Sequence, residues 1–195
     1  MNHKSYPKGY RQIEVLDFMR SRKQLLIVGW SGIIVTLVMI VFGLIAYPFS
    51  PTWEFLKSCW WAWLIAPAMY VLYIPLHELV HGVLMYALSG VRPKYGLKLP
   101  YAYAGSHVYF DKKSHNLIAL APLIVWGVIL FALERTLPAQ WLWFFYLTQI
   151  SNVSGSVGDI YCVLYLMKLP GDILIQDTGT RMRILAPRPN NEEQK

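Results

Sequence analysis

Charge is scarce in this chain. Only 15% of its 195 residues are Asp, Glu, Lys or Arg, and 55% are hydrophobic. A soluble domain carries about 25% charged residues. The composition therefore excludes an ordinary soluble globular domain. It predicts a small polytopic membrane protein with no room for a second large domain.

The chain has few cysteines, and its N-terminal region does not resemble a secretory signal peptide. The chain has 2 cysteines, Cys59 and Cys162, which are too few for a disulfide framework. We expect them near opposite membrane faces, so they should not pair. The first long apolar run follows 24 polar, basic residues and is longer than the apolar part of a signal peptide. We therefore expect no cleavable signal peptide.

Long apolar runs predict the fold class, an all-α polytopic membrane protein with short β-hairpin-like segments. Each of four runs is long enough to cross a hydrocarbon core of about 30 Å. Alternating residues with Gly and Pro in the loop at 94–110, and in the tail at 173–185, predict two small hairpins. The expected organisation is a cytoplasmic segment at 1–24 with a short amphipathic stretch near 13–19, a transmembrane domain at 25–168 with spans at about 25–47, 60–88, 115–133 and 141–167, and a cytoplasmic tail at 169–195.

The basic residues predict the orientation of these spans. Counted along the chain, the segments outside the four spans contain 6, 1, 5, 1 and 5 Lys plus Arg, which accounts for all 18. The positive-inside rule then places both termini and the middle loop in the cytoplasm. The net charge of +7 is explained by this topology, so we expect contact with membrane lipid and no nucleic-acid partner.

The second apolar run contains the motif His-Glu-x-x-His, from His77 through Glu78 to His81. On a helix the two imidazoles lie one turn apart on one face, so both can reach one metal ion, and Glu78 can hold a water molecule beside it. A coincidental pair of core histidines is the alternative. In lipid, however, two His and one Glu are costly, and such a cluster is a functional site by default.

A catalytic zinc site needs a third protein ligand. His77 is expected roughly 16 Å from the cytoplasmic end of its span, and Asp159 about 13 Å from the end of the fourth span. Asp159 is the one acidic residue of that span, and it follows a segment rich in Ser and Gly that permits close helix packing. Asp159 is thus the predicted third ligand. The alternative is a packing patch in which it bonds to Asn or Ser.

Two segments resemble a known family. The helix His77-Glu78-Leu79-Val80-His81-Gly82 and the later segment from Asn152 to Ile160 are similar to small bacterial membrane proteins called "putative zincin peptidases". More distantly, they resemble the site-2-protease class of intramembrane zinc metalloproteases. The resemblance implies that His77, His81 and Asp159 bind Zn²⁺ and that Glu78 is the catalytic carboxylate. It also implies that Asn152 holds the backbone of the substrate.

The implied function is zinc-dependent hydrolysis of membrane-associated proteins or peptides, with Glu78 as general base for a zinc-activated water. We expect a multi-pass protein of a bacterial cell membrane with a polar cleft open to the cytoplasm. A serine protease using Ser154 would leave Glu78 unexplained, and an aspartyl protease needs a second membrane Asp. The remaining alternative is a non-catalytic metal-binding scaffold or small transporter. The substrate's identity and the oligomeric state stay open.

Overall fold

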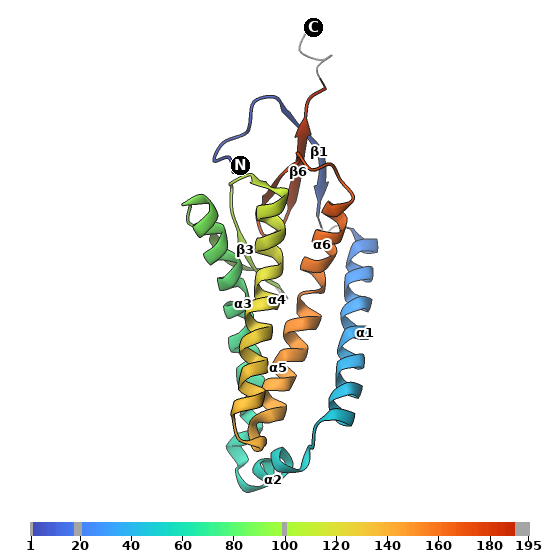
Figure 1. The fold of residues 1–195 in the computed structure, drawn as a ribbon, viewed down its shortest axis with the longest axis vertical. Helices are drawn as coiled ribbons and strands as arrows, with labels where there is room; N and C mark the ends of the chain where they lie inside the picture. Colours follow the sequence, from blue (N-terminus) through green and yellow to red (C-terminus); the bar gives the residue numbers. More distant parts are fainter. Residues whose placement is uncertain (1, 18–20, 99–100, 190–195) are drawn as a thin grey trace.

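The structure is a computed structural model that describes residues 2–17, 21–98 and 101–189. Long helices run side by side, and strands gather at one end of them (Figure 1). The segments near both chain ends lie at this sheet end. The short helix α2 (Ser50–Ser58) lies at the opposite end of the bundle.

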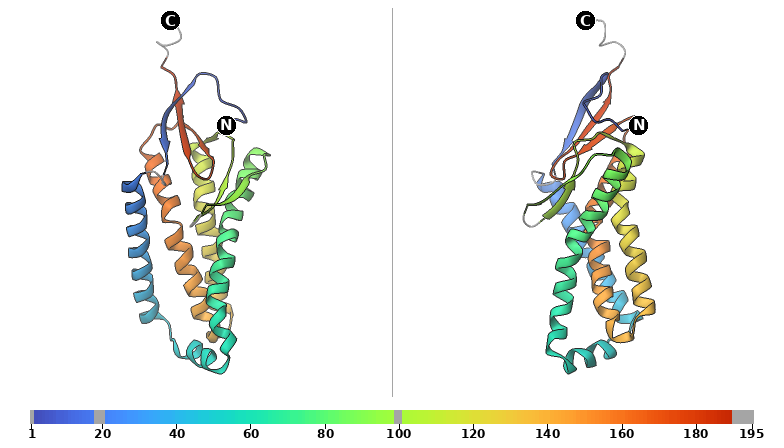
Figure 2. Two further views of the ribbon diagram at one scale, coloured as in Figure 1. Left: turned by 180° about the vertical axis from the view of Figure 1, so that it is seen from behind. Right: turned by 90° about the vertical axis from the view of Figure 1, so that its left-hand side faces the viewer.

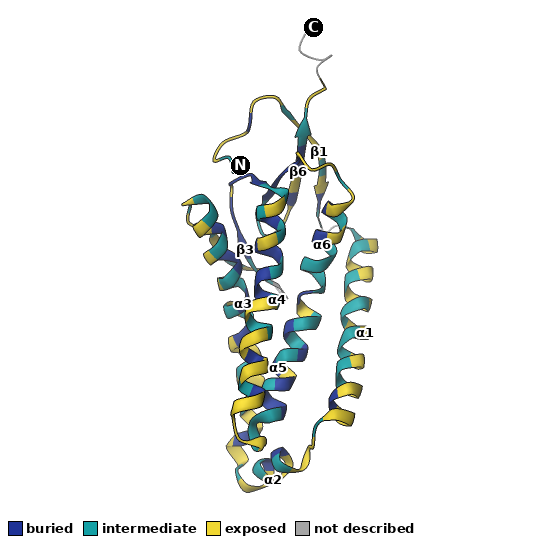
Figure 3. Ribbon diagram, viewed as in Figure 1, coloured by how far each residue is buried: buried dark blue, intermediate teal, exposed yellow. Residues whose placement is uncertain are grey.

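Three helical segments of the described chain are long and apolar enough to cross a membrane. They are α1 (Arg22–Ala46), the segment Trp60–Ser89 and α4 (Lys112–Thr136). The second consists of a 3-10 turn, η1 (Trp60–Leu64), followed by α3 (Ile65–Ser89), which continues through Pro75. Exposed residues recur along the length of these helices (Figure 3). Many of them are large and apolar, as Ile45 at 82% exposure illustrates, so the bundle exterior suits lipid.

The expected fourth span at 141–167 is not confirmed as a single helix. The segment is divided into η2 (Ala139–Trp141), α5 (Leu142–Gly155) and α6 (Val157–Met167). The break falls at Ser156, whose N–H faces the carbonyls of Asn152 and Ser154. Small residues with poor helix propensity surround this point, and Gly–Ser pairs are common sites of helix kinks.

Helix α5 lies at the centre of the bundle. It packs against α1, α3 and α4, and α6 continues along α4 and α1. Helix α1 stands at the side of the bundle (Figures 1 and 2). It is held there by Tyr146, whose Oη donates a hydrogen bond to the carbonyl of Met39 over 2.6 Å. A Cβ atom at Gly43 would lie 2.2 Å from the Tyr146 ring, so this close approach depends on glycine.

A four-stranded antiparallel sheet makes the all-α prediction incomplete. Its strand order is β1-β6-β5-β4, with β1 at Tyr10–Leu16, β4 at Phe110–Asp111, β5 at Leu174–Asp177 and β6 at Met182–Pro187. The predicted tail hairpin is confirmed as β5–β6. The amphipathic stretch expected near 13–19 is instead part of β1, and residues 18–20 lie outside the described residues. A register shift between Gln12 and Glu14 interrupts the alternation that identifies strands in a sequence.

The predicted hairpin in the middle loop is also confirmed. It pairs β2 (Lys94–Lys98) with β3 (Tyr101–Gly105) and lies against α3. Just beyond β3, the N–H of Ser106 donates to the carbonyl of Asp177 over 2.7 Å. The hairpin is therefore fixed between a membrane helix and the end of β5.

Candidate metal centre

Helix α3 presents one buried stripe toward the bundle. Tyr73, His77, His81 and Met85 follow one another at four-residue spacing, and all four are buried. This spacing places side chains above one another on one helix face. The sequence pattern therefore puts both imidazoles into the bundle interior rather than into lipid.

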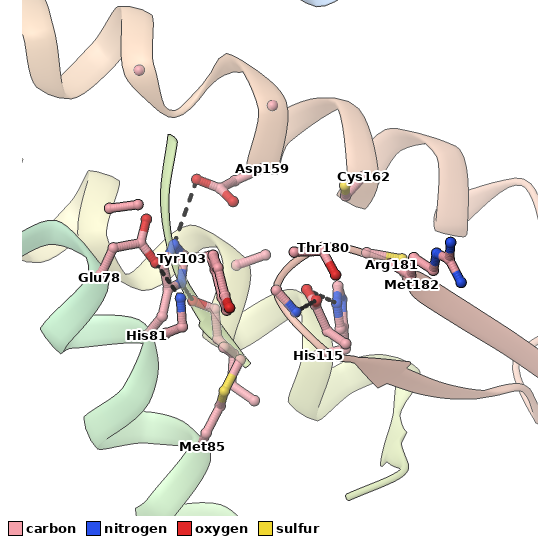
Figure 4. Close-up of a pocket in the computed structure, with 18 of the residues that line it drawn as sticks. Glu78, His81, Met85, Tyr103, His115, Asp159, Cys162, Thr180, Arg181 and Met182 are labelled. Atoms are coloured by element: carbon pink, nitrogen blue, oxygen red, sulfur yellow. Dashed lines mark hydrogen bonds and ion pairs between the residues drawn. The ribbon is translucent and has the colours of Figure 1, made fainter. Parts of the chain in front are cut away.

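Asp159 of α6 meets these imidazoles. Its Oδ2 lies 3.5 Å from Nε2 of His77 and 3.7 Å from Nε2 of His81. The dashed contact between His81 and Asp159 is visible in Figure 4. One potential ligand atom from each residue lies within 4.8 Å of the others, and this is the group that the described residues offer to a metal ion.

The donor set fits Zn²⁺. The Nδ1 of His81 lies 2.9 Å from the Ile118 carbonyl oxygen, which can only accept a hydrogen bond, so Nδ1 carries a proton and Nε2 is the ring nitrogen left for a metal ion. Nε2 faces a carboxylate oxygen of Asp159, and a metal ion between the two atoms would be bound by both. Ligand atoms on a tetrahedral zinc at about 2.0–2.1 Å are about 3.4 Å apart. The Nε2–Oδ2 distances are close to this separation.

Glu78 lies next to the three potential ligands but is not one of them. Its Oε2 accepts a hydrogen bond of 2.7 Å from the N–H of Ala104 in β3. The carboxylate is partly buried and faces the same cavity as His81 and Asp159 (Figure 4). A main-chain donor therefore fixes the position of Glu78.

Tyr95 connects the other hairpin strand to the same helix. A Cβ atom at Gly82, directly after His81, would lie 2.0 Å from the Tyr95 Oη, so glycine permits this contact. Partial burial of Tyr95, together with the negative charge of Glu78, raises the pKa of its hydroxyl above the ordinary value of 10.0. Both hairpin strands are thus in contact with the motif helix.

A cavity of about 290 Å³ adjoins the centre. Glu78, His81 and Asp159 lie on one side of it, and Tyr103 of β3 lies close to them (Figure 4). Thr180 and Arg181, from the turn between β5 and β6, complete another part of the lining. The cavity is therefore lined by the helices and, in part, by segments of the sheet end, where the charge pattern predicts the cytoplasm.

Two cavity residues were not predicted as part of the site. His115 of α4 is buried, and its Nε2 lies 3.8 Å from Oδ2 of Asp177 in β5. The sequence places His115 at the start of the predicted span at 115–133 and Asp177 in the predicted tail hairpin at 173–185. Pairing of β4 with β5 carries Asp177 back over α4, and the residues themselves give no signal of that pairing.

Asn152 and Tyr73 form a second arrangement behind the centre. Asn152 is fully buried, and it is not among the described residues that line the cavity. Its Nδ2 donates to the Leu123 carbonyl over 3.2 Å, and its Oδ1 accepts from the Tyr73 hydroxyl over 2.8 Å. The predicted role in holding substrate stays a prediction. Tyr73 was missed, although its position four residues before His77 indicates that the two can touch.

A sequence profile described as "Putative zincin peptidase" matches residues 70–174. The match contains the His-Glu-x-x-His motif, Asp159 and the hairpin between them. The chain belongs to this family. Membership in the zincin peptidase family supports metallopeptidase activity and zinc as the metal.

One curated relative is similar to part of this chain. An "Uncharacterized 24.7 kDa protein in gap 5'region" from Pyrococcus woesei is 32% identical over 124 residues. The aligned part is 61% of this chain and 54% of the relative, so the chain spans about half the length of the curated relative it matches. No solved structure matches the fold significantly.

Proposed function

We propose that this protein is an intramembrane zinc metallopeptidase that hydrolyses peptide bonds in membrane-associated substrates. One observation carries the proposal: two imidazoles and a carboxylate converge beside Glu78 on the wall of a cavity. The exterior of the surrounding helices is apolar, and a cluster of this kind within a membrane helix is costly unless it serves a function.

The chain's own residues have distinct roles in this chemistry. Bound zinc would be held by His77, His81 and Asp159; it lowers the pKa of a coordinated water and polarises a carbonyl group. Glu78 accepts the proton of the attacking water and delivers it to the leaving amine. The Ala104 N–H holds the Glu78 carboxylate in place during both transfers.

The membrane arrangement is part of the proposal. Helices α5 and α6 together act as a fourth crossing that returns antiparallel to α4. From Leu142 to Met167 they cover about 39 Å at 1.5 Å per residue, more than the hydrocarbon core requires. With the positive-inside rule, the sheet end and both termini lie in the cytoplasm of a bacterial cell.

The hairpin suggests how a substrate binds. Strand β3 pairs with β2 along one edge, and its Ala104 N–H points the other way, to Glu78. An extended peptide that lies along this second edge would bring a peptide bond next to the general base. Strand addition of this kind orients the peptide through main-chain hydrogen bonds.

The first test is the metal content of the purified protein in detergent. We expect about one zinc per chain in the wild type, and none in His81→Ala or Asp159→Ala, because each variant removes one of three ligands. If His81→Ala loses zinc and Asp159→Ala retains it, the third ligand is a residue other than Asp159. A folded wild type without metal would contradict the peptidase proposal and favour a scaffold without catalysis.

A further inference from the structure

Asn152 is a buried polar side chain in the middle of the bundle, with 0% exposure. It comes from α5, and its two partners come from α3 and α4. A polar amide in this position is costly unless both ends are bonded. Both the amino group and the oxygen of the Asn152 amide form hydrogen bonds. The direction of each bond shows which group donates the hydrogen.

The Leu123 carbonyl fixes the orientation of the Asn152 amide. A carbonyl oxygen can only accept, so the Asn152 atom that lies 3.2 Å from it is the amino group. The amide oxygen therefore points to Tyr73, whose Oη lies 2.8 Å away. A flipped amide would place two acceptors against each other at Leu123.

The hydrogen bond between Tyr73 and Asn152 also determines which atom donates in the contact between Tyr73 and His77. The Tyr73 hydroxyl has one hydrogen, and the Asn152 oxygen takes it. Only a lone pair of the Tyr73 oxygen remains for Nδ1 of His77, which lies 2.6 Å away. Nδ1 must therefore carry a proton, which leaves Nε2, 3.5 Å from Oδ2 of Asp159, as the ring nitrogen that can bind a metal.

We propose that Tyr73 and Asn152 are positioning residues that fix the tautomer and the ring orientation of His77 for the metal. The inference rests on the metal-binding part of the proposed function and is independent of hydrolysis. The two ligand histidines are then held differently. His81 is held by the main-chain carbonyl of Ile118, whereas His77 is held by two side chains from two helices.

A role in packing alone is the competing explanation. The Tyr73 ring meets Trp126 edge-on with centroids 6.2 Å apart, so a large substitution would disturb the bundle. Tyr73→Phe retains the ring and removes only the hydroxyl. Tyr70→Phe is the matched control, since it removes an exposed hydroxyl from the same helix. Asn152→Leu has Thr148→Val as its control, because the Thr148 hydroxyl donates to the Phe144 carbonyl within α5.

The experiment measures Zn²⁺ affinity by competition with a chelator, and the absorption spectrum of the Co²⁺-loaded protein, in detergent. We expect Tyr73→Phe to bind one metal at saturation with affinity reduced about 10–100-fold, the usual effect of removing such a partner. Its cobalt spectrum should change, because the His77 ring is released. Asn152→Leu should reduce the Zn²⁺ affinity in the same way. The double variant should bind Zn²⁺ as tightly as the single variant with the lower affinity, because Asn152 acts through Tyr73.

The outcomes separate this inference from the proposed function. Wild-type affinity and an unchanged cobalt spectrum in Tyr73→Phe would overturn the inference and leave the metal centre intact. A lower unfolding temperature of the metal-free variant with unchanged affinity would also overturn it, in favour of packing. If the wild type binds no metal, both the inference and the proposed function fail. Tyr73→Phe alone decides the case if Asn152→Leu does not fold.

Discussion

At the scale of single residues, the proposed function assigns metal binding and proton transfer to different groups. His77, His81 and Asp159 form the cluster, and Glu78 stands beside it, attached to the Ala104 N–H. Substitution of Glu78 can therefore be separated from loss of metal.

Glu78→Gln should retain about one zinc per chain and lose peptide hydrolysis by a factor of about 10²–10⁴, the range for a general acid–base group. The amide oxygen of Gln still accepts from Ala104, so the hairpin should stay in place. The measurement is cleavage of a membrane-anchored reporter in proteoliposomes, alongside metal content. The control is Glu54→Gln, which changes an exposed carboxylate in α2. Full proteolysis by Glu78→Gln would exclude the general-base role.

The residues of the site differ in how far the sequence could predict them. His77, Glu78 and His81 follow from local spacing, because a helix turns a four-residue interval into proximity. Asp159 was inferred from equal depth, and the structure brings it to the two histidines. His115 and Asp177 could not be found in this way. Their proximity depends on the pairing of β4 with β5, a contact between distant segments.

At the scale of elements, the hairpin β2–β3 connects the motif helix to the tail. A Cβ atom at Gly105 would lie 2.3 Å from the Thr178 carbonyl carbon, which is a main-chain atom and cannot rotate away. The hairpin thus has little freedom to shift without disturbing the Glu78 contact one residue earlier.

Gly105→Ala should keep zinc, because the ligands lie on helices, but lower both hydrolysis and stability. Overpacking of this kind costs about 1–3 kcal/mol. Gly171→Ala is the control, since a Cβ there meets no atom within 4 Å, and its effect should stay within about 0.5 kcal/mol. Unfolding temperature, metal content and reporter cleavage check both variants. Equal stability and activity of the two variants would show that this docking does not position Glu78.

Element prediction succeeded where patterns were uninterrupted. Three apolar runs gave long helices, and two alternating segments gave hairpins. Strand β1 was missed because the irregularity near Gln12 disrupts alternation over a short segment. The fourth apolar run is divided at Ser156. This break was not predicted, because hydropathy is averaged over a window and does not register a local interruption of a helix.

At the scale of the whole molecule, the charge pattern predicts the membrane orientation, and the native cysteines can test it. Cys59 is partly exposed and follows α2 at the end of the bundle away from the sheet, whereas Cys162 is buried. An impermeant reagent should therefore distinguish the two membrane sides without new reporter domains.

A membrane-impermeant maleimide added to intact cells should label the wild type, because the predicted orientation places Cys59 outside the cell. Cys59→Ala should remain unlabelled, because Cys162 is covered. Adding Lys8→Cys to Cys59→Ala places a thiol at an exposed position on the sheet side. That double variant should react only after the cells are permeabilised. Labelling of the Lys8→Cys variant in intact cells would show that the membrane orientation is opposite to the predicted one.

The pairing of β1 with β6 also determines the order in which this protein can be completed during translation. Asp17, just after β1, bonds to Arg181, just before β6, and 164 residues separate them. The ribosome releases β1 first, so that strand waits with an open edge until every helix has been made. The turn at Thr180, which lines the cavity, arrives at the same late moment. A nascent chain thus contains His77, His81 and Asp159 before its cavity is enclosed, and synthesis of the tail, rather than of the helices, completes the lining of the cavity.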